Sequence, residues 1–234
     1  MNHARRRSCA LGIAITIALA TACGGQTSKA SPPSSAGSTP STAVSSLSSS
    51  AASSSIPPSP SLTIQAAPTV PADVPTTGPN LLHAGEAPPV MPVLATMDSA
   101  AGAVAFAKFF IQTLDWGYAT TSSTYVRHYY EATCFECESD AQGVDEAEQK
   151  QHRFVGDRFL NITVRQIPST GKHEGTADLA VKAVFDITGT DVVDAAGKSV
   201  QAVPPRPGYS ETLYLSWRGA GWSVVDMIPA GTPE

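Results

Sequence analysis

The sequence is poor in charge, in aromatic residues and in cysteine. Charged residues make up 15% and aromatic residues 7% of the 234 positions, where an ordinary soluble domain has roughly 25% charged residues. The balance of charge is acidic, with a formal net charge of −5 at pH 7, which argues against binding to nucleic acid. The 4 cysteines are too few to staple a small disulfide-rich fold.

Signatures of several catalytic classes are also missing. The chain has no glycine-rich phosphate-binding loop, no His-Glu-x-x-His zinc motif and no Ser/His/Asp order of a hydrolase. Its longest uncharged apolar run, residues 9–20, is shorter than the roughly 20 residues that a membrane-spanning helix needs. We therefore expect no cofactor and no metal.

The N-terminus has the pattern of an export signal. Arg5, Arg6 and Arg7 precede the apolar run, which ends in Leu-Ala-Thr-Ala-Cys-Gly-Gly at 19–25. This ending resembles the bacterial lipobox, in which cleavage before the cysteine leaves a lipidated N-terminus. The resemblance implies a lipoprotein signal peptide at residues 1–22 and lipidation of Cys23, with plain secretion and a retained helix as the alternatives.

A lipidated Cys23 would hold the protein at the extracytoplasmic face of the cell membrane, because two or more acyl chains give stable anchoring. The next segment, residues 23–97, has the composition of a linker. It contains 13 of the 19 prolines, many serines and only three formally charged residues. Such a segment cannot bury enough surface to offset the entropy of ordering, so we expect a disordered tether.

The rest of the chain shows helical patterns first. Asp98 and Ser99 can cap a helix, and the apolar stripe that follows runs to about Tyr118. We expect a short second helix that includes Val126 and Tyr130, and a more polar third helix from about Ser139 to Arg153.

Alternating apolar and polar residues follow at 160–165, 177–187, 213–217 and 222–228, with a turn at 195–198. Residues 98–234 therefore predict an α+β domain, in which N-terminal helices pack on one face of a curved antiparallel sheet. The domain is acidic, which disfavours direct docking on anionic lipid headgroups.

Three short motifs carry a family resemblance. They are Phe-Ala-Lys-Phe-Phe at 106–110, Tyr-Ala-Thr at 118–120 and Cys-Phe-Glu-Cys at 134–137. Together with the order of elements they resemble a family of actinobacterial lipoproteins of unknown function with a SnoaL-like (nuclear transport factor 2-like) cone fold. The resemblance covers residues 98–230 and implies a fold and an envelope location, but no activity.

Cys134 and Cys137 form the sharpest local motif of the domain. In an exported protein the default state of such a pair is a disulfide, and cysteines three positions apart at a helix end can reach the required Cα separation. We expect a structural disulfide. The alternatives are a thioredoxin-like redox pair and a zinc site with His128 and His152, whose spacing matches no closed four-ligand pattern.

Two residues are candidates for acid–base chemistry in a pocket. Strand alternation puts Asp226 on the apolar side with Trp222 and Val224, where an inward carboxylate could act as a base, and His128 lies on the second helix. A paired or rim position for Asp226 is the alternative. The acidic stretch at 136–148 lacks the order of a calcium loop, so we interpret it as a helix whose first turns favour acids.

These patterns predict a membrane-anchored envelope lipoprotein with a non-catalytic binding or accessory domain. Its expected partners are the membrane, through the lipid anchor, and an envelope protein or a small apolar ligand. The alternative is a cone-fold isomerase or hydrolase that acts on a small apolar ligand.

Overall fold

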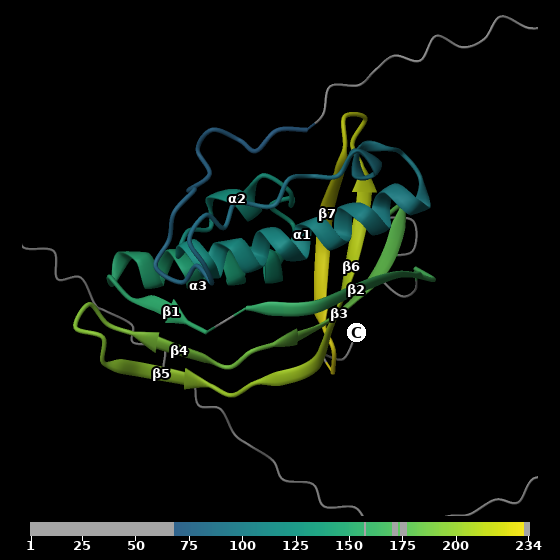
Figure 1. Ribbon diagram of the computed structural model, residues 1–234. Coiled ribbons are helices and arrows are strands. Elements are labelled where there is room, and N and C mark those ends of the chain that lie inside the picture. The colour runs from purple at the N-terminus through teal and green to yellow at the C-terminus, as the bar shows by residue number, and fades with distance from the viewer. Residues whose placement is uncertain (1–67, 157, 170–172, 174–176, 232–234) are drawn as a thin grey trace, which may run out of the picture. The chain divides into compact units, whose positions relative to one another are not determined.

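The computed structural model describes residues 68–156, 158–169, 173 and 177–231 (Figure 1). Three α-helices precede two antiparallel sheets, which confirms the predicted α+β class and the order of helices before strands. Among the described residues, no helix is both long and apolar enough to cross a membrane. The predicted signal peptide and Cys23 lie outside the described residues.

The packed part of the chain begins earlier than the sequence predicted. The segment 68–97, which we expected to belong to the tether, runs along the helices and contains the 3₁₀ helix η1 (Val93–Thr96). Val74 and Ala95 are buried in the main core, and the Pro75 carbonyl accepts a 2.9 Å hydrogen bond from the Trp116 indole. The proline-rich composition of the segment indicated a disordered tether and gave no sign of these contacts.

A buried ion cluster fastens the same segment to the domain. Arg158, only 6% exposed, donates to both carboxylate oxygens of Asp115 and, at 2.6 Å, to Glu86. Asp115 also accepts a 2.8 Å hydrogen bond from the Phe159 backbone. Glu86 therefore connects the N-terminal segment to α1 and to the start of β2.

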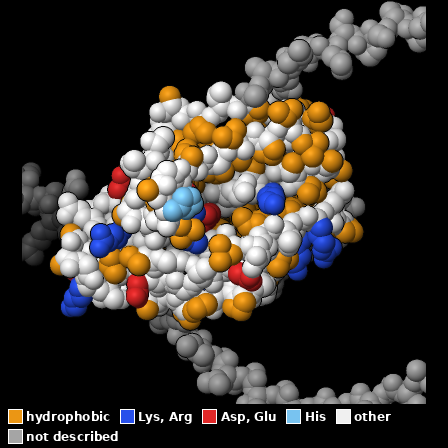
Figure 2. Space-filling model, in the orientation of Figure 1, with side chains coloured by type: hydrophobic (Ala, Val, Ile, Leu, Met, Phe, Trp, Pro, Cys, Tyr) orange, Lys and Arg blue, Asp and Glu red, His pale blue; other side chains and the backbone are white. Residues whose placement is uncertain are grey.

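The surface around η1 is apolar. Hydrophobic side chains gather over η1 and the N-terminal half of α1 in the space-filling view (Figure 2). Val90, Val93, Leu94 and Met97 are all exposed there. An exposed apolar patch of this kind marks a surface that another molecule can cover.

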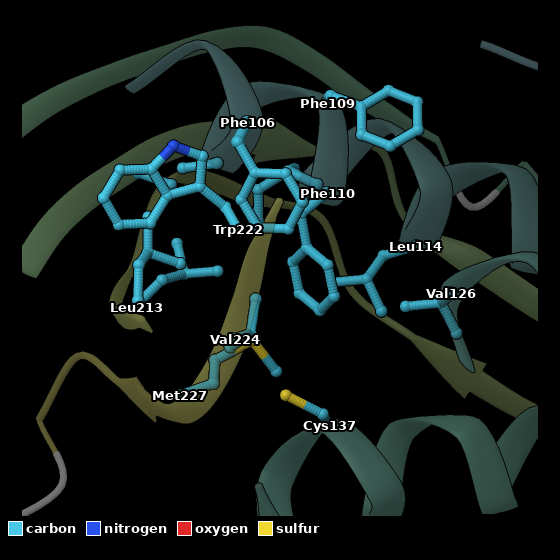
Figure 3. Packing of buried hydrophobic residues seen from close by; sticks show 14 of the residues in the cluster. Phe106, Phe109, Phe110, Leu114, Val126, Cys137, Leu213, Trp222, Val224 and Met227 are labelled. Atoms are coloured by element: carbon cyan, nitrogen blue, oxygen red, sulfur yellow. The ribbon is translucent and has the colours of Figure 1, made fainter. Parts of the chain in front are cut away.

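Helix α1 (Ala100–Thr120) begins as predicted, with the Ser99 side chain accepting a 3.0 Å hydrogen bond from the Gly102 backbone. Phe109, Phe110 and Ile111 are completely buried in the main core, where each such side chain stabilises the fold by about 1.5–3 kcal/mol. Figure 3 shows aromatic side chains of α1 packed against apolar side chains of β6 and β7.

The second and third helices differ from the predicted bounds. Helix α2 (Thr124–Arg127) has a single turn, and α3 (Phe135–Gln149) begins four residues before the expected Ser139. Cys134 is the N-cap of α3, and its sulfur accepts a hydrogen bond from the Cys137 backbone. The pattern missed this start because cysteine is not a usual capping residue.

The two sheets share two long, bent runs of chain. The four-stranded sheet has the order β2 (Phe159–Ile167), β3 (Leu179–Ile187), β6 (Arg206–Trp217), β7 (Trp222–Pro229). The three-stranded sheet has the order β1 (Arg153–Val155), β4 (Thr190–Val193), β5 (Ser199–Val203). The chain bends between β3 and β4 and again between β5 and β6 (Figure 1).

The bend requires a close approach between Gly189 and Pro205. A Cβ atom at Gly189 would lie 2.9 Å from the Pro205 ring, so glycine is needed for the two connections to pass each other. The bend turns the three-stranded sheet towards α3 (Figure 1), and a cavity lies between the helix and the strands.

Candidate functional site

A cavity of about 340 Å³ lies between α3 and the bend of the sheets. Every strand except β7 contributes to its lining, together with α1 and α3. The residues that matter for its chemistry are Tyr118, Asp140, Gly143, Phe159, Tyr209 and Glu211.

Aromatic rings form much of the cavity wall. The Tyr118 ring packs edge-on against Phe154, with ring centroids 5.0 Å apart, and contacts Phe159 at 5.7 Å. Tyr209 packs edge-on against Phe185 at 5.4 Å, and the Arg206 guanidinium lies 4.6 Å above the Tyr209 ring. These rings provide a rigid surface for an apolar body or for a cation over a ring face.

Glu211 is the most unusual residue of the cavity. It lies on β6 in the same alternation as the core residues Leu213 and Leu215, yet it is a carboxylic acid with only 6% of its surface exposed. One of its oxygens, Oε2, is buried without a hydrogen-bond partner in the described part of the chain. An unsatisfied buried carboxyl oxygen costs free energy, so its presence calls for a functional explanation.

Burial and, next in size, the carboxylate of Asp140 raise the pKa of Glu211 to about 8. The Tyr209 hydroxyl, which hydrogen bonds to Glu211, lowers the pKa, while Glu136 raises it and Arg206 lowers it. At neutral pH the Glu211 carboxyl is therefore mostly protonated. Burial also raises the pKa of the Tyr209 hydroxyl, and the Glu211 carboxyl adds to that rise.

Gly143 opens the cavity on the helix side. It lies in the middle of α3 and lines the cavity, and a Cβ atom built there would meet nothing within 4 Å. Glycine costs a helix interior about 0.5–1 kcal/mol relative to alanine. The open space beside Gly143 is thus room that a side chain could fill.

Asp226 does not face the interior as predicted. A β-bulge between the pairs Tyr214–Asp226 and Leu215–Val224 inserts one residue into β7 and reverses its alternation. Met227 takes the buried position, and Asp226 lies on the opposite side, 3.1 Å from the imidazole of His173.

His128 does not join Asp226. It follows α2 at the surface, and its Nε2 lies 3.1 Å from the Asp73 carboxylate. Neither residue lines the cavity that contains Glu211. The structure therefore does not bring the two predicted pocket residues together.

Cys134 and Cys137 form the disulfide that the sequence predicted, with a Cα separation of 5.3 Å. Both residues are fully buried, and Cys137 points towards Val224 and Met227 (Figure 3). A redox-active pair needs an accessible thiolate, so this burial favours a structural bond. Within the described ranges, no group of three or more His, Cys, Asp or Glu residues is placed to hold a metal ion.

A second, shallower hollow lies between α1 and β2, below the apolar patch around η1. Its lining is mainly aliphatic, from Leu94, Val104, Ile162 and Val164, with Lys108 at its side. It contains no carboxylate. The hollow suits contact with an apolar surface better than it suits acid–base chemistry.

The domain is thus an α+β fold with an aromatic cavity and one buried, protonatable carboxyl. The model of a family of unknown function, DUF6318, matches residues 83–228, and the chain belongs to this family. The match starts within the segment that we had assigned to the tether, in agreement with the packing of residues 83–97. No curated protein matches the sequence.

Proposed function

We propose that the protein is a lipid-anchored envelope protein whose domain binds a small, largely apolar ligand without transforming it. The signal pattern and Cys23 support the anchor and the extracytoplasmic location. The order of helices and strands and the cavity in the bend support a SnoaL-like cone fold. The three short motifs support the relation to actinobacterial lipoproteins.

One observation carries the binding function, namely the position of Glu211. A core carboxyl with an unsatisfied oxygen destabilises the empty domain. A leucine at that position would extend the row of Leu213 and Leu215 and would remove the cost. A ligand that interacts with the Glu211 carboxyl would explain why this destabilising residue is present, because binding sites combine apolar walls with a few convergent polar groups.

Binding is favoured over catalysis because the described residues that line the cavity include no histidine and no cysteine to work with Glu211. The other carboxyl groups of the lining are those of Asp140 and Glu146. The two phenols, Tyr118 and Tyr209, are present, but burial raises the pKa of Tyr209 above its ordinary value. A single protonated carboxyl can hold a ligand, whereas acid–base turnover usually needs a second group.

The cavity is tested by filling it. Leucine at position 143 (Gly143→Leu) places a side chain in the open space, and leucine also favours the helix over glycine. We expect native mass spectrometry of the protein purified from the cell envelope to show a bound small molecule in the wild type and none in Gly143→Leu. Gln142→Leu, on the exposed side of α3, is the matched control and should retain the ligand.

The anchor is tested at the cysteine of the signal pattern. Cys23→Ala should move the protein from the membrane fraction to the soluble fraction and abolish labelling with a fatty-acid probe. Cys9→Ala, in the apolar run of the same signal, should leave both properties unchanged. An unprocessed N-terminus at Met1 in the wild-type protein would overturn this part of the proposal.

A cone-fold isomerase or hydrolase is the second candidate, and the geometry favours Glu211 over Asp226 and His128 as its acid–base group. The raised pKa of Glu211 is the specific observation in its favour. If the bound molecule is chemically altered by the wild type and only bound by Glu211→Gln, the domain is an enzyme. Recovery of the molecule unchanged from the wild type supports binding alone.

The exposed apolar side chains around η1 support a further accessory role, in which an envelope protein covers the apolar patch of Val90, Val93, Leu94 and Met97. Crosslinking of the wild type but not of Leu94→Glu to one envelope protein would support this role. Leu82→Glu, at another exposed leucine, is the matched control.

A further inference from the structure

The charges around the cavity are mostly acidic. Glu211 of β6 faces Glu136 and Asp140 of α3, whose carboxylates both raise its pKa, and Arg206 at the exposed start of β6 is the base that acts on it. Acidic groups thus outnumber basic ones in a space whose walls are aromatic rings.

We propose that the ligand is an organic cation, an ammonium with an apolar body, whose positive charge lies between Glu211 and Asp140. This inference rests on the proposed function and specifies the chemistry of the same cavity. The ammonium is attracted by the two carboxylates, and its alkyl or aryl body packs against the rings of Tyr118 and Phe159. Aromatic faces beside carboxylates are a common way to bind substituted ammonium groups.

Other acids of α3 pair with basic side chains, and one of them, Glu146, also lines the cavity. Glu138 and Asp145 bind Arg127 at 2.6 and 2.8 Å, and Glu146 binds Lys150 at 2.5 Å. Tyr130 and Arg127 hold the pKa of Glu138 at about 2. These three acids of α3 are thus paired with bases. Glu136 and Asp140 are the acids of α3 that raise the pKa of Glu211.

The geometry favours an organic cation over a metal ion. Within the described part of the chain, no three His, Cys, Asp or Glu residues are placed to ligate one ion, so Glu211, Asp140 and Glu136 do not form a three-ligand metal site. A substituted ammonium does not need three converging ligands because its charge spreads over several CH groups. The cavity volume of about 340 Å³ also exceeds what one ion requires.

Binding of the cation requires the ionised form of Glu211, so the protein releases a proton when it binds. The proton leaves the Glu211 carboxyl to solvent, and the carboxylate that remains pairs with the ammonium. The charged and titratable groups that act on the pKa of Glu211 are Tyr209 and Arg206 on β6 and Asp140 and Glu136 on α3. Glu146 of α3 also lines the cavity, and Lys182 of β3 lines a smaller hollow together with Glu211. The described cavity residues of β2, β3, β4 and β5 bear no charge.

The test compares two probes of the same shape. Benzyltrimethylammonium carries a positive charge, and neopentylbenzene is its neutral carbon isostere. We expect calorimetric titration of the folded, lipid-free protein at pH 8.5 to show saturable binding of the cation, about tenfold or more tighter than of the isostere. Titration in buffers of different ionisation enthalpy at pH 7 should reveal release of close to one proton per cation bound.

The pH dependence identifies the group responsible. Because Glu211 is protonated below its pKa of about 8, the affinity for the cation should rise by at least about tenfold from pH 6 to pH 8.5. Glu211→Gln should lower the affinity at pH 8.5 by about tenfold and flatten the pH profile. Glu148→Gln, on the exposed side of α3, should change neither.

The outcomes separate the two proposals. If the neutral isostere binds as tightly as the cation, or if affinity falls as the pH rises, the inference of a cationic ligand is overturned and the binding cavity stands. If neither probe binds while native mass spectrometry finds a neutral molecule in the wild type, the same conclusion follows. If neither probe binds and no molecule is found, both proposals fail.

Discussion

The indole nitrogen of Trp116 donates a hydrogen bond to the carbonyl oxygen of Pro75, which lies 41 positions earlier in the chain. A second contact of this kind joins the Tyr125 hydroxyl to the Pro89 carbonyl. Both acceptors lie in the proline-rich stretch before η1, residues 68–92, which has no helix or strand. The buried ends of two helical side chains therefore depend on a segment that composition alone assigns to a linker.

Truncation tests the start of the folded domain. A chain that begins at residue 98 lacks Glu86 and the Pro75 carbonyl and leaves the Arg158 guanidinium short of an acceptor. We expect it to be several kcal/mol less stable than a chain that begins at residue 68, because a buried cation and a buried indole N–H lose their partners. Urea unfolding of the two chains measures the difference, and equal midpoints would contradict the packing described for residues 68–97.

The buried ion cluster should be sensitive to the loss of its cation. Arg158→Met leaves the carboxylates of Asp115 and Glu86 facing each other in a largely buried site. Breaking a buried pair by removing one partner typically costs about 3–5 kcal/mol. Urea unfolding measures the cost.

Arg165→Met provides the control for this substitution, because Arg165 is exposed on the neighbouring part of β2. A change within about 0.5 kcal/mol is expected there. If Arg158→Met proved as mild as Arg165→Met, the cluster would not be the anchor of the N-terminal segment.

The disulfide should stabilise the domain modestly, and it should resist reduction by thiols while the protein is folded. The loop between Cys134 and Cys137 is very short, so its removal in Cys134→Ala/Cys137→Ala should cost about 1–2 kcal/mol on the loop-length trend. Because both residues are fully buried, reduction of the native protein should require denaturant. Rapid reduction by a mild thiol without denaturant would instead indicate an accessible, redox-active bond.

Glu211 should make the domain less stable as the pH rises. Its folded pKa of about 8 lies above the ordinary glutamate value of 4.5, so the folded state binds its proton more tightly than the unfolded state does. The resulting stabilisation is present below pH 4.5 and is lost as the pH rises to about 8.

Glu211→Gln removes this titration. Between pH 5 and pH 9 the variant should become increasingly more stable than the wild type. At pH 9 we expect its free energy of unfolding to be higher by about a few kcal/mol. Thermal or urea unfolding across this range gives the difference, with Glu148→Gln as the exposed control. Parallel stability profiles for wild type and Glu211→Gln would show that the carboxyl is not desolvated as described.

Periodicity predicted most of the sheet and the first helix. The apolar stripe and Ser99 located α1, and alternation located the strands that became β2, β3, β6 and β7. These elements bury one face against a continuous core, so the positions of the apolar residues in the sequence predict which side chains face inward. The spacing of Cys134 and Cys137 likewise predicted their bond.

The site was harder to predict because its key residues break the pattern. A bulge in β7 reversed the orientation of Asp226, and no local signal in the sequence marks that extra residue. Glu211 could have been found by extending the alternation of Leu213 and Leu215 two residues towards the N-terminus. A carboxylate at an inward position is usually interpreted as the end of the buried run, whereas here it lies at the base of a cavity.

The outer edge of β7 is already occupied. Tyr130 forms a parallel bridge with Val224, and the backbone amide of Glu131 donates to the Val224 carbonyl at 2.9 Å. The edge of β7 is therefore covered at Val224, whereas β2 is the other edge strand of the four-stranded sheet over the described residues. Covering part of an edge in this way reduces the number of backbone groups with which another chain could pair.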